Sequence, residues 1–309
     1  AQRALLQENG RCKRGVGDEC PPAVCHETAG SDASMQCVPR FPMAGRPGTK
    51  MGCQLDDRSE PFGDAYDCMT DADKESITRV LVNFGKAIAA YEYSLVSRNS
   101  AFDLFVAEGP RSTKLSPAAQ RGARLFVGKA DCVECHSTPL FSNGEFENVA
   151  VPQVGPGVPT ESDCPESGVC DCVNGKNCLP WGAWDGLSKL KSNGFRRDSH
   201  WSDDPNDKSR AEWVALTLDS SLKGAWRTPS LRDVALTAPY MHNGIFKTLA
   251  EVVHHYNQGG DRSDVVGSPA KQMQPLGLSD IEQADLVAFL ESLTGAALPA
   301  ALIQTPALP

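Results

Sequence analysis

The spacing of apolar residues predicts a long helix after an irregular first quarter of the chain. Thr70 and Asp73 have the spacing of a capping box, which marks a helix start. The apolar face of this helix recurs at helical spacing along the residues Ile77, Leu81, Phe84, Ile88 and Leu95. Residues 1–70 before it show no such periodicity.

Three shorter helices are predicted further along the chain, over residues 116–128, 248–256 and 279–295. The first begins at Ser116, with Pro117 at the position that proline favours. The other two begin at capping boxes, formed by Thr248 with Glu251 and by Ser279 with Glu282. Residues 137–225 carry few periodic signals. The pattern predicts a mainly α-helical fold with long loops.

Composition and charge argue against a nucleic-acid partner and against a membrane-spanning segment. The chain has 309 residues with 30 basic and 39 acidic side chains, which gives a net charge of -9. This balance argues against nucleic acid as a partner, and it fits either plain solubility or docking to a basic redox protein. The mean hydropathy is -0.33, and no apolar run reaches the roughly 18 residues that a membrane span needs.

Residues 132–136 have the sequence Cys-Val-Glu-Cys-His, which combines two thiols and an imidazole. A CxxC pair serves as a redox dithiol, as half of a zinc site or as an attachment site for haem c. A histidine directly after the second cysteine favours haem c, with Cys132 and Cys135 forming thioethers and His136 binding the iron. A thioredoxin-like pair usually follows a strand, whereas this motif follows a predicted helix and loop. A zinc site would need a second ligand pair at matching spacing.

The other ten cysteines form two even groups, one near the start and one in an insert at about residues 160–180. They are Cys12, Cys20, Cys25, Cys37, Cys53, Cys68, Cys164, Cys170, Cys172 and Cys178. Ten paired thiols would form five disulfides, which together with haem c predicts a periplasmic or extracellular protein. The second group holding zinc is the alternative. Residues 1–15 lack the apolar segment of a signal peptide, so we expect the encoded protein to begin upstream.

Four blocks in order resemble the dihaem cytochrome c peroxidase and MauG family. They are VNFGKAIAAYEYSLVSRNSAFDLF, LSPAAQRGARLFVGKADCVECHSTPLFSNGEF, RTPSLRDVALTAPYMHNGIFKTLAEVVHHYNQGG and LSDIEQADLVAFLESLTG. The resemblance covers roughly residues 76–296 and matches the second, C-terminal haem domain of the family. It implies helical cytochrome c-like domains and peroxide-linked electron transfer between two haems.

The chain departs from the family because it has no first CxxCH motif. The nearest arrangement, from Cys20 to Cys25 and His26, is more simply explained by a disulfide. Residues 1–75 therefore resemble a disulfide-rich tail of a first haem domain, and residues 76–309 form the haem domain. A second haem would lie upstream of Ala1 or on another chain.

The resemblance also implies a second axial ligand, fourteen residues after the histidine of the AP-Y-x-H-x-G block. Counting from His242 leads to Tyr256. The peroxidase branch of the family has methionine at this place and the MauG branch has tyrosine, so the match favours the MauG type, whose haem pair oxidises a protein side chain. The alternative for Tyr256 is a core aromatic residue. The rival ligands are Met241, His254, His255 and Met273.

Other residues are candidates through their chemistry or through the resemblance. Arg227 and Arg232 could bind haem propionates by bidentate hydrogen bonds, or be solvated at the surface. His242 is either a hydrogen-bonding residue between the haems or a turn histidine. The family implies a calcium ion held by carbonyl oxygens near Thr237 and Pro239.

The sequence thus predicts an exported haem c oxidoreductase that uses hydrogen peroxide and a redox partner protein or second haem domain. The alternative is a single-haem electron carrier, or a subunit of a cytochrome assembly, without catalysis of its own. An enzyme needs an open or openable iron site, whereas a carrier keeps both axial ligands bound.

Overall fold

The computed structural model describes most of the chain after residue 70. The described residues are 71–154, 158, 182–204, 217–263 and 265–305, together with the backbone of short strands at 24–27, 35–38, 171–172 and 178–179. The chain divides into two compact units, residues 1–91 and 92–309. The domain boundary expected near residue 75 stays a prediction.

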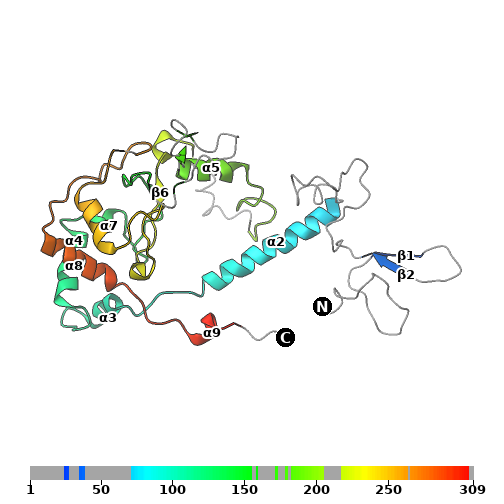
Figure 1. The fold of residues 1–309 in the computed structure, drawn as a ribbon. Helices are drawn as coiled ribbons and strands as arrows, with labels where there is room; N and C mark the ends of the chain where they lie inside the picture. The colour runs from blue at the N-terminus through cyan, green and yellow to red at the C-terminus, as the bar shows by residue number, and fades with distance from the viewer. Residues whose placement is uncertain are drawn as a thin grey trace. The chain divides into compact units, whose positions relative to one another are not determined.

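The described part is mainly helical with few strands, as the sequence predicts (Figure 1). The α-helices are α2 (Asp71–Glu92), α3 (Ala101–Glu108), α4 (Pro117–Val127), α5 (Ala183–Ser192), α7 (Leu249–Asn257), α8 (Asp280–Glu291) and α9 (Ala300–Ile303). Three 3₁₀ turns are η2 (Cys132–Glu134), η6 (Ser220–Leu222) and η7 (Val234–Leu236). Among the described residues, none of the helices has the length and apolar character to cross a membrane.

The strands form three short antiparallel pairs. They are β1 (Val24–Glu27) with β2 (Met35–Val38), β3 (Phe146–Glu147) with β6 (Trp226–Arg227), and β4 (Asp171–Cys172) with β5 (Cys178–Leu179). The register sets the backbone of Cys25 opposite Cys37, and that of Cys172 opposite Cys178. Directly opposed α-carbons lie about 4.5 to 5.5 Å apart, which a disulfide can bridge. The five expected disulfides stay a prediction, because the side chains of these ten cysteines lie outside the described residues.

The three helix starts expected at Ser116, Thr248 and Ser279 are confirmed. Each of these side chains accepts a hydrogen bond from a backbone N–H three residues later, at 3.1 to 3.3 Å. At Thr248 and Ser279 the glutamate of the capping box also accepts from the cap's own N–H. Because these signals are local, they can be recognised from a few consecutive residues.

Two expected helix ends are wrong. α2 ends at Glu92, so Leu95 lies beyond it, in a turn where its N–H donates to the Glu92 carbonyl. α8 ends at Glu291 and not at Gly295, since a tight turn follows at Ser292. The Gly295 N–H donates instead to the Asp233 carboxylate at 2.7 Å. Thr70, the expected cap of α2, lies outside the described residues.

Three α-helices of the described residues were not expected from the sequence: α3, α5 and the single turn α9. α3 begins at a capping box formed by Ser100 and Asp103, but eight residues are too few for a clear apolar period. α5 lies within residues 137–225, where an irregular chain was expected. It follows Gly182 and has no side-chain cap, so it lacks the usual start signal.

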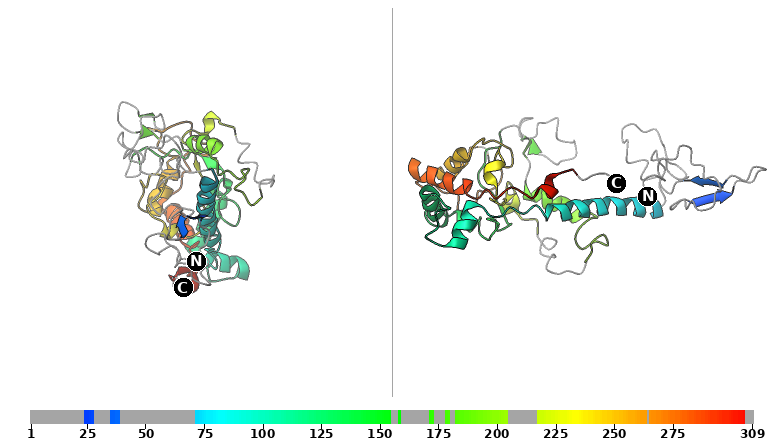
Figure 2. Two further views of the ribbon diagram at one scale, coloured as in Figure 1. Left: turned by 90° about the vertical axis from the view of Figure 1, so that its right-hand side faces the viewer. Right: turned by 90° about the horizontal axis from the view of Figure 1, so that it is seen from below.

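The core of the second unit forms where α4 and α8 lie side by side (Figures 1 and 2). Gly122 of α4 faces the backbone of Asp285 in α8, with no room for a side chain between them. The Arg121 guanidinium donates two hydrogen bonds to the nearly buried Asp285 carboxylate, at 2.7 and 2.6 Å. Two parallel bonds of this kind fix the orientation of one helix against the other.

Four phenylalanines extend this core toward the Cys-Val-Glu-Cys-His turn. Phe126 of α4 and Phe289 of α8 pack with Phe102 of α3 and Phe141, with ring centroids 5.1 to 6.2 Å apart. Most of these contacts are edge-to-face, an arrangement that aromatic rings favour. Since Phe141 lies five residues after His136, the cluster anchors the loop that follows the motif.

Replacing Gly122 by alanine should destabilise the protein by about 2 kcal/mol. Alanine favours a helix over glycine by about 1 kcal/mol. Here, however, a β-carbon would lie 2.8 Å from the Phe289 β-carbon and closer still to the Asp285 carbonyl, and overpacking costs about 1 to 3 kcal/mol. Gly186→Ala in α5 is the matched control: its β-carbon meets nothing within 4 Å, so it should be neutral or stabilising. Urea unfolding of both variants checks this; equal midpoints would contradict the tight contact.

Candidate haem site

The Cys-Val-Glu-Cys-His motif forms a tight turn directly after α4. The Ala130 N–H donates to the Leu125 carbonyl at the end of that helix, and the chain then turns at Asp131 (φ 51°) into η2. Within the motif, the His136 N–H donates to the Cys132 carbonyl at 2.9 Å. This hydrogen bond brings the two thiols and the imidazole together on a single turn.

The His136 ring is oriented by the loop that follows it. Its Nδ1 lies 2.8 Å from the Phe141 carbonyl oxygen, so the ring donates Nδ1–H there. Burial lowers the pKa of His136, while hydrogen bonds to the Phe141 and Pro229 carbonyls oppose this shift. A partly buried, neutral imidazole held by a backbone carbonyl has the form of a metal ligand.

The two thiols are neutral and shielded. Burial raises the pKa of Cys132 to about 12, and burial together with nearby carboxylates, Glu147 first, raises that of Cys135 to about 11. Redox-active dithiols have a lowered pKa instead. Among the described residues, no group of three or more His, Cys, Asp or Glu side chains could hold a metal ion. The turn therefore fits thioether attachment of haem better than a redox dithiol or a zinc site.

Tyr256, near the end of α7, lies within electrostatic reach of the two thiols of this turn. Burial raises the pKa of its hydroxyl, and the thiols of Cys132 and Cys135 lie close enough to raise it further. The preceding residue, His255, is buried with its Nε2 2.8 Å from the Val149 carbonyl. On the other side, the Asn257 amide bonds the backbone of Leu278. These contacts fix the part of α7 that carries Tyr256.

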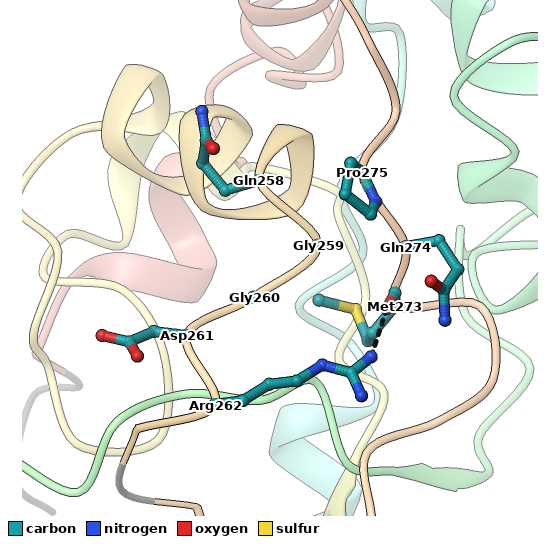
Figure 3. A pocket seen from close by; sticks show the side chains of 8 residues that line it. All are labelled: Gln258, Gly259, Gly260, Asp261, Arg262, Met273, Gln274 and Pro275. Atoms are coloured by element: carbon teal, nitrogen blue, oxygen red, sulfur yellow. Dashed lines mark hydrogen bonds between the residues drawn. The ribbon is translucent and has the colours of Figure 1, made fainter.

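Three of the four rival ligands, His254, His255 and Met273, have other surroundings. His254 is exposed, and the His255 ring is engaged with the Val149 carbonyl. Met273 lines a cavity of about 530 Å³ at the C-terminal end of α7 (Figure 3). There the Arg262 guanidinium donates to the Met273 carbonyl at 2.7 Å. The residues that line this cavity do not include Cys132, Cys135 or His136.

His242 stacks on Trp226, with ring centroids 4.1 Å apart and planes inclined by 8°. Its Nε2 lies 3.3 Å from the amide oxygen of Gln153, a buried residue. Burial lowers the pKa of His242 to about 4, so the ring is neutral near pH 7. His242 is thus a partly buried, hydrogen-bonded residue that lies in a turn; its expected role between the haems stays a prediction.

The stability of the fold should decrease as the pH falls from about 6.5 to 4. In this window an unfolded His242, with a pKa near 6.5, binds a proton that the folded form, with a pKa of about 4, does not bind. Protonation of His242 in the unfolded chain should therefore lower the folding equilibrium constant by up to tenfold for each unit that the pH falls. Chemical unfolding at pH 7 and pH 5 measures the effect. His242→Gln should reduce the pH dependence, whereas the exposed-site control His254→Gln should retain it; identical profiles would contradict the assignment.

The two candidate arginines differ in their contacts. Arg232 donates to both oxygens of Asp103 at 3.0 Å and to the Pro139 carbonyl at 2.8 Å, and its guanidinium lies 5.7 Å from the Phe141 ring centroid. Arg232 thus ties the loop after the motif to α3. Arg227 is exposed, opposite Phe146 in the β3–β6 pair, and none of the hydrogen bonds among the described residues involves its side chain.

The segment expected to bind calcium lies at the surface. Thr237 and Pro239 are exposed, and the Thr237 hydroxyl donates to the Val234 carbonyl at 3.0 Å. The peptide bond before Pro239 is cis. The calcium site stays a prediction.

Comparison with curated proteins finds relatives of one kind. A cytochrome-c peroxidase, IdrP2 of Pseudomonas sp. (strain SCT), is 35% identical over 226 residues, which are 72% of this chain and 50% of that protein. IdrP1 of Denitromonas iodatirespirans is 36% identical over 67% of this chain and 48% of its own length. The methylamine utilization protein MauG of Methylorubrum extorquens is 31% identical over 72% of this chain and 46% of that protein. The chain spans about half the length of these relatives.

Comparison with solved structures finds a variant of the dihaem peroxidase BthA from Burkholderia thailandensis. Its TM-score is 0.47 at 22% identity, over 80% of this chain and 59% of that one. No protein-family model matches the chain. The family assignment rests on the curated relatives, which are more than 30% identical over more than two thirds of the chain. Their family implies c-type haem. The chain belongs to the dihaem cytochrome c peroxidase and MauG family.

Proposed function

We propose that this chain is the haem-bearing part of an exported oxidoreductase that relays electrons or oxidising equivalents in a hydrogen-peroxide-dependent reaction. One observation carries the proposal: the thiols of Cys132 and Cys135, which precede His136, are near enough to the Tyr256 hydroxyl to add to the rise of its pKa that burial causes. One turn thus offers both attachment points and a proximal nitrogen, and a neighbouring helix offers an oxygen donor. Covalently bound haem would supply one-electron chemistry at this place.

The proposed roles follow from the contacts of each side chain. Cys132 and Cys135 would form the thioethers, and His136 would use Nε2 as the proximal ligand while Nδ1–H stays on the Phe141 carbonyl. Tyr256 would be the second ligand. Burial raises the pKa of its hydroxyl, so it would ligate as a phenolate only beside a positive charge that offsets the cost of burial.

The remaining components of the reaction are proposed from the family. A second haem, where peroxide would react, would be bound upstream of residue 76 or by another chain, and calcium would bind near Thr237 and Pro239. A redox partner protein would complete the path. The haem c motif and the ten further cysteines support a periplasmic location. The relatives support the reaction class only, since the chain spans half their length.

The second candidate is a single-haem electron carrier or an assembly subunit without its own catalysis. It is favoured by the single CxxCH motif in the sequence. In this case His136 and Tyr256 would both stay bound to the iron, and peroxide would have no place to react.

The experiment that separates the two functions uses the full-length exported protein, purified with its haem. Pyridine haemochrome gives the number of haems per chain, and optical spectra before and after one equivalent of hydrogen peroxide report the reaction. Two haems with a peroxide-induced spectral change, and peroxide-dependent oxidation of a reduced cytochrome, would support the enzyme. One haem per chain and an unchanged spectrum would contradict the enzyme and support the single-haem electron carrier.

A further inference from the structure

Trp226 carries a buried hydrogen-bond donor that lacks an acceptor. Among the described residues, its indole Nε1 is one of two buried side-chain nitrogen or oxygen atoms without a hydrogen-bond partner. Buried indole N–H groups usually find an acceptor, since an unpaired one is costly. The other such atom, Ser97 Oγ, belongs to a hydroxyl that can rotate, whereas the indole N–H has a fixed direction.

The indole is held in place on several sides. His242 stacks on one face of the ring at 4.1 Å and is itself bonded to Gln153. On another side, Gly182 approaches so closely that a β-carbon there would lie 3.3 Å from Trp226 Cε2. The backbone of Trp226 is paired with Glu147 in the β3–β6 ribbon. With so little freedom, the ring cannot turn its N–H toward water without disturbing these contacts.

The β3–β6 ribbon borders the candidate haem site. Two residues after Trp226, the Thr228 N–H donates to the Glu145 carbonyl at 2.8 Å, and the Thr228 carbonyl accepts from Ser142 Oγ at 2.7 Å. The next residue, Asn143, donates its N–H to the Cys135 carbonyl at 2.8 Å. A short chain of hydrogen bonds thus connects the Trp226 strand to the motif itself.

We propose that Trp226 is a cofactor-positioning residue whose indole N–H donates a hydrogen bond to a haem propionate. A propionate is an ionised carboxylate. It would be a strong hydrogen-bond acceptor for an unpaired, buried N–H at the edge of a haem site. The inference rests on the proposed haem at Cys132 and Cys135. It differs from the arginine assignment, since Arg232 is engaged with Asp103 and Pro139.

The stacking of His242 on Trp226 restricts the orientation of the indole ring. Because His242 is neutral near pH 7, it does not compete as a cation for the propionate. Its role would be to fix the plane of the indole, and that of Gln153 to fix the imidazole. The three residues come from different parts of the chain and meet only in the fold.

The test compares the haem-loaded variants Trp226→Phe and Trp201→Phe. Phenylalanine keeps an aromatic ring against His242 but removes the N–H. Trp201, which packs on His200 and Phe195, is the matched control. The pH dependence of the haem reduction potential gives the pKa of the propionate. This pKa should rise by about one unit, a tenfold higher proton affinity, in Trp226→Phe and stay unchanged in Trp201→Phe. The resonance Raman band of the propionate bend should shift only in Trp226→Phe. Profiles and bands equal to wild type would overturn the proposal.

A second measurement tests the proposal if the Trp226→Phe variant does not acquire haem. In a crystal structure of the wild-type protein with its haem, Nε1 should lie about 3 Å from a propionate oxygen; a separation beyond 3.5 Å would overturn the inference. Both measurements are independent of peroxide. A protein that binds haem and shows this hydrogen bond but ignores peroxide would refute the proposed enzyme and leave the Trp226 assignment in place.

Discussion

Replacing Cys132 and Cys135 by serine should abolish covalent haem attachment. The two thiols lie on a single turn with His136, and the thioether bonds require sulfur, which serine lacks. We expect the purified double variant to be colourless, and its mass to lack one haem on the peptide that contains residue 132. Denaturing gel electrophoresis with haem staining and mass spectrometry measure the loss.

The matched control is His254→Ala, which removes an exposed histidine of α7 outside the site. It should retain a full complement of covalent haem. Covalent haem at wild-type stoichiometry in the Cys132→Ser, Cys135→Ser protein would show that attachment occurs elsewhere. The redox interpretation of this turn would then be wrong.

Tyr256→Phe should change the coordination of the iron and raise its reduction potential by roughly 100 mV or more. An oxygen donor stabilises ferric iron, and each tenfold preference for the ferric form corresponds to about 59 mV for a one-electron couple. The variant keeps the ring that fills the buried space and loses only the hydroxyl. Optical and electron paramagnetic resonance spectra should change from six-coordinate to five-coordinate ferric haem, and potentiometry measures the shift.

Two further variants make the result specific. His254→Ala, on the same helix, should leave the spectrum and the potential unchanged. Met273→Leu tests the rival ligand, which lines the separate cavity at the end of α7 (Figure 3). A wild-type spectrum in Tyr256→Phe together with a changed spectrum in Met273→Leu would assign the iron to the methionine.

The local features of the fold could be predicted from the sequence. The caps at Ser116, Thr248 and Ser279 involve residues three apart, and the haem motif occupies five consecutive positions. The start of α3 was also readable, because Ser100 and Asp103 form a capping box. Its eight residues offer too little apolar periodicity to predict the helix from the pattern alone.

The remaining parts of the site depend on tertiary packing. No spacing in the sequence connects Trp226 with His242 and Gln153, although the fold brings all three into contact. The partner of Arg232 was equally hidden: a guanidinium fits a propionate or an aspartate, and only the position of α3 selects Asp103. The resemblance predicts Tyr256 as a ligand, but its closeness to the two thiols depends on how α7 packs.

The loop after the motif has a consequence for electron transfer kinetics. Its backbone carbonyls are held by Arg232 at Pro139, by Ser230 at Leu140 and by the His136 ring at Phe141, at distances of 2.7 to 2.8 Å. As the proposed proximal ligand, a His136 ring embedded in so many short contacts would shift little when the charge on a bound iron changes. The inner-sphere reorganisation energy on the proximal side would therefore be small, so rapid exchange with a redox partner would need only a modest driving force.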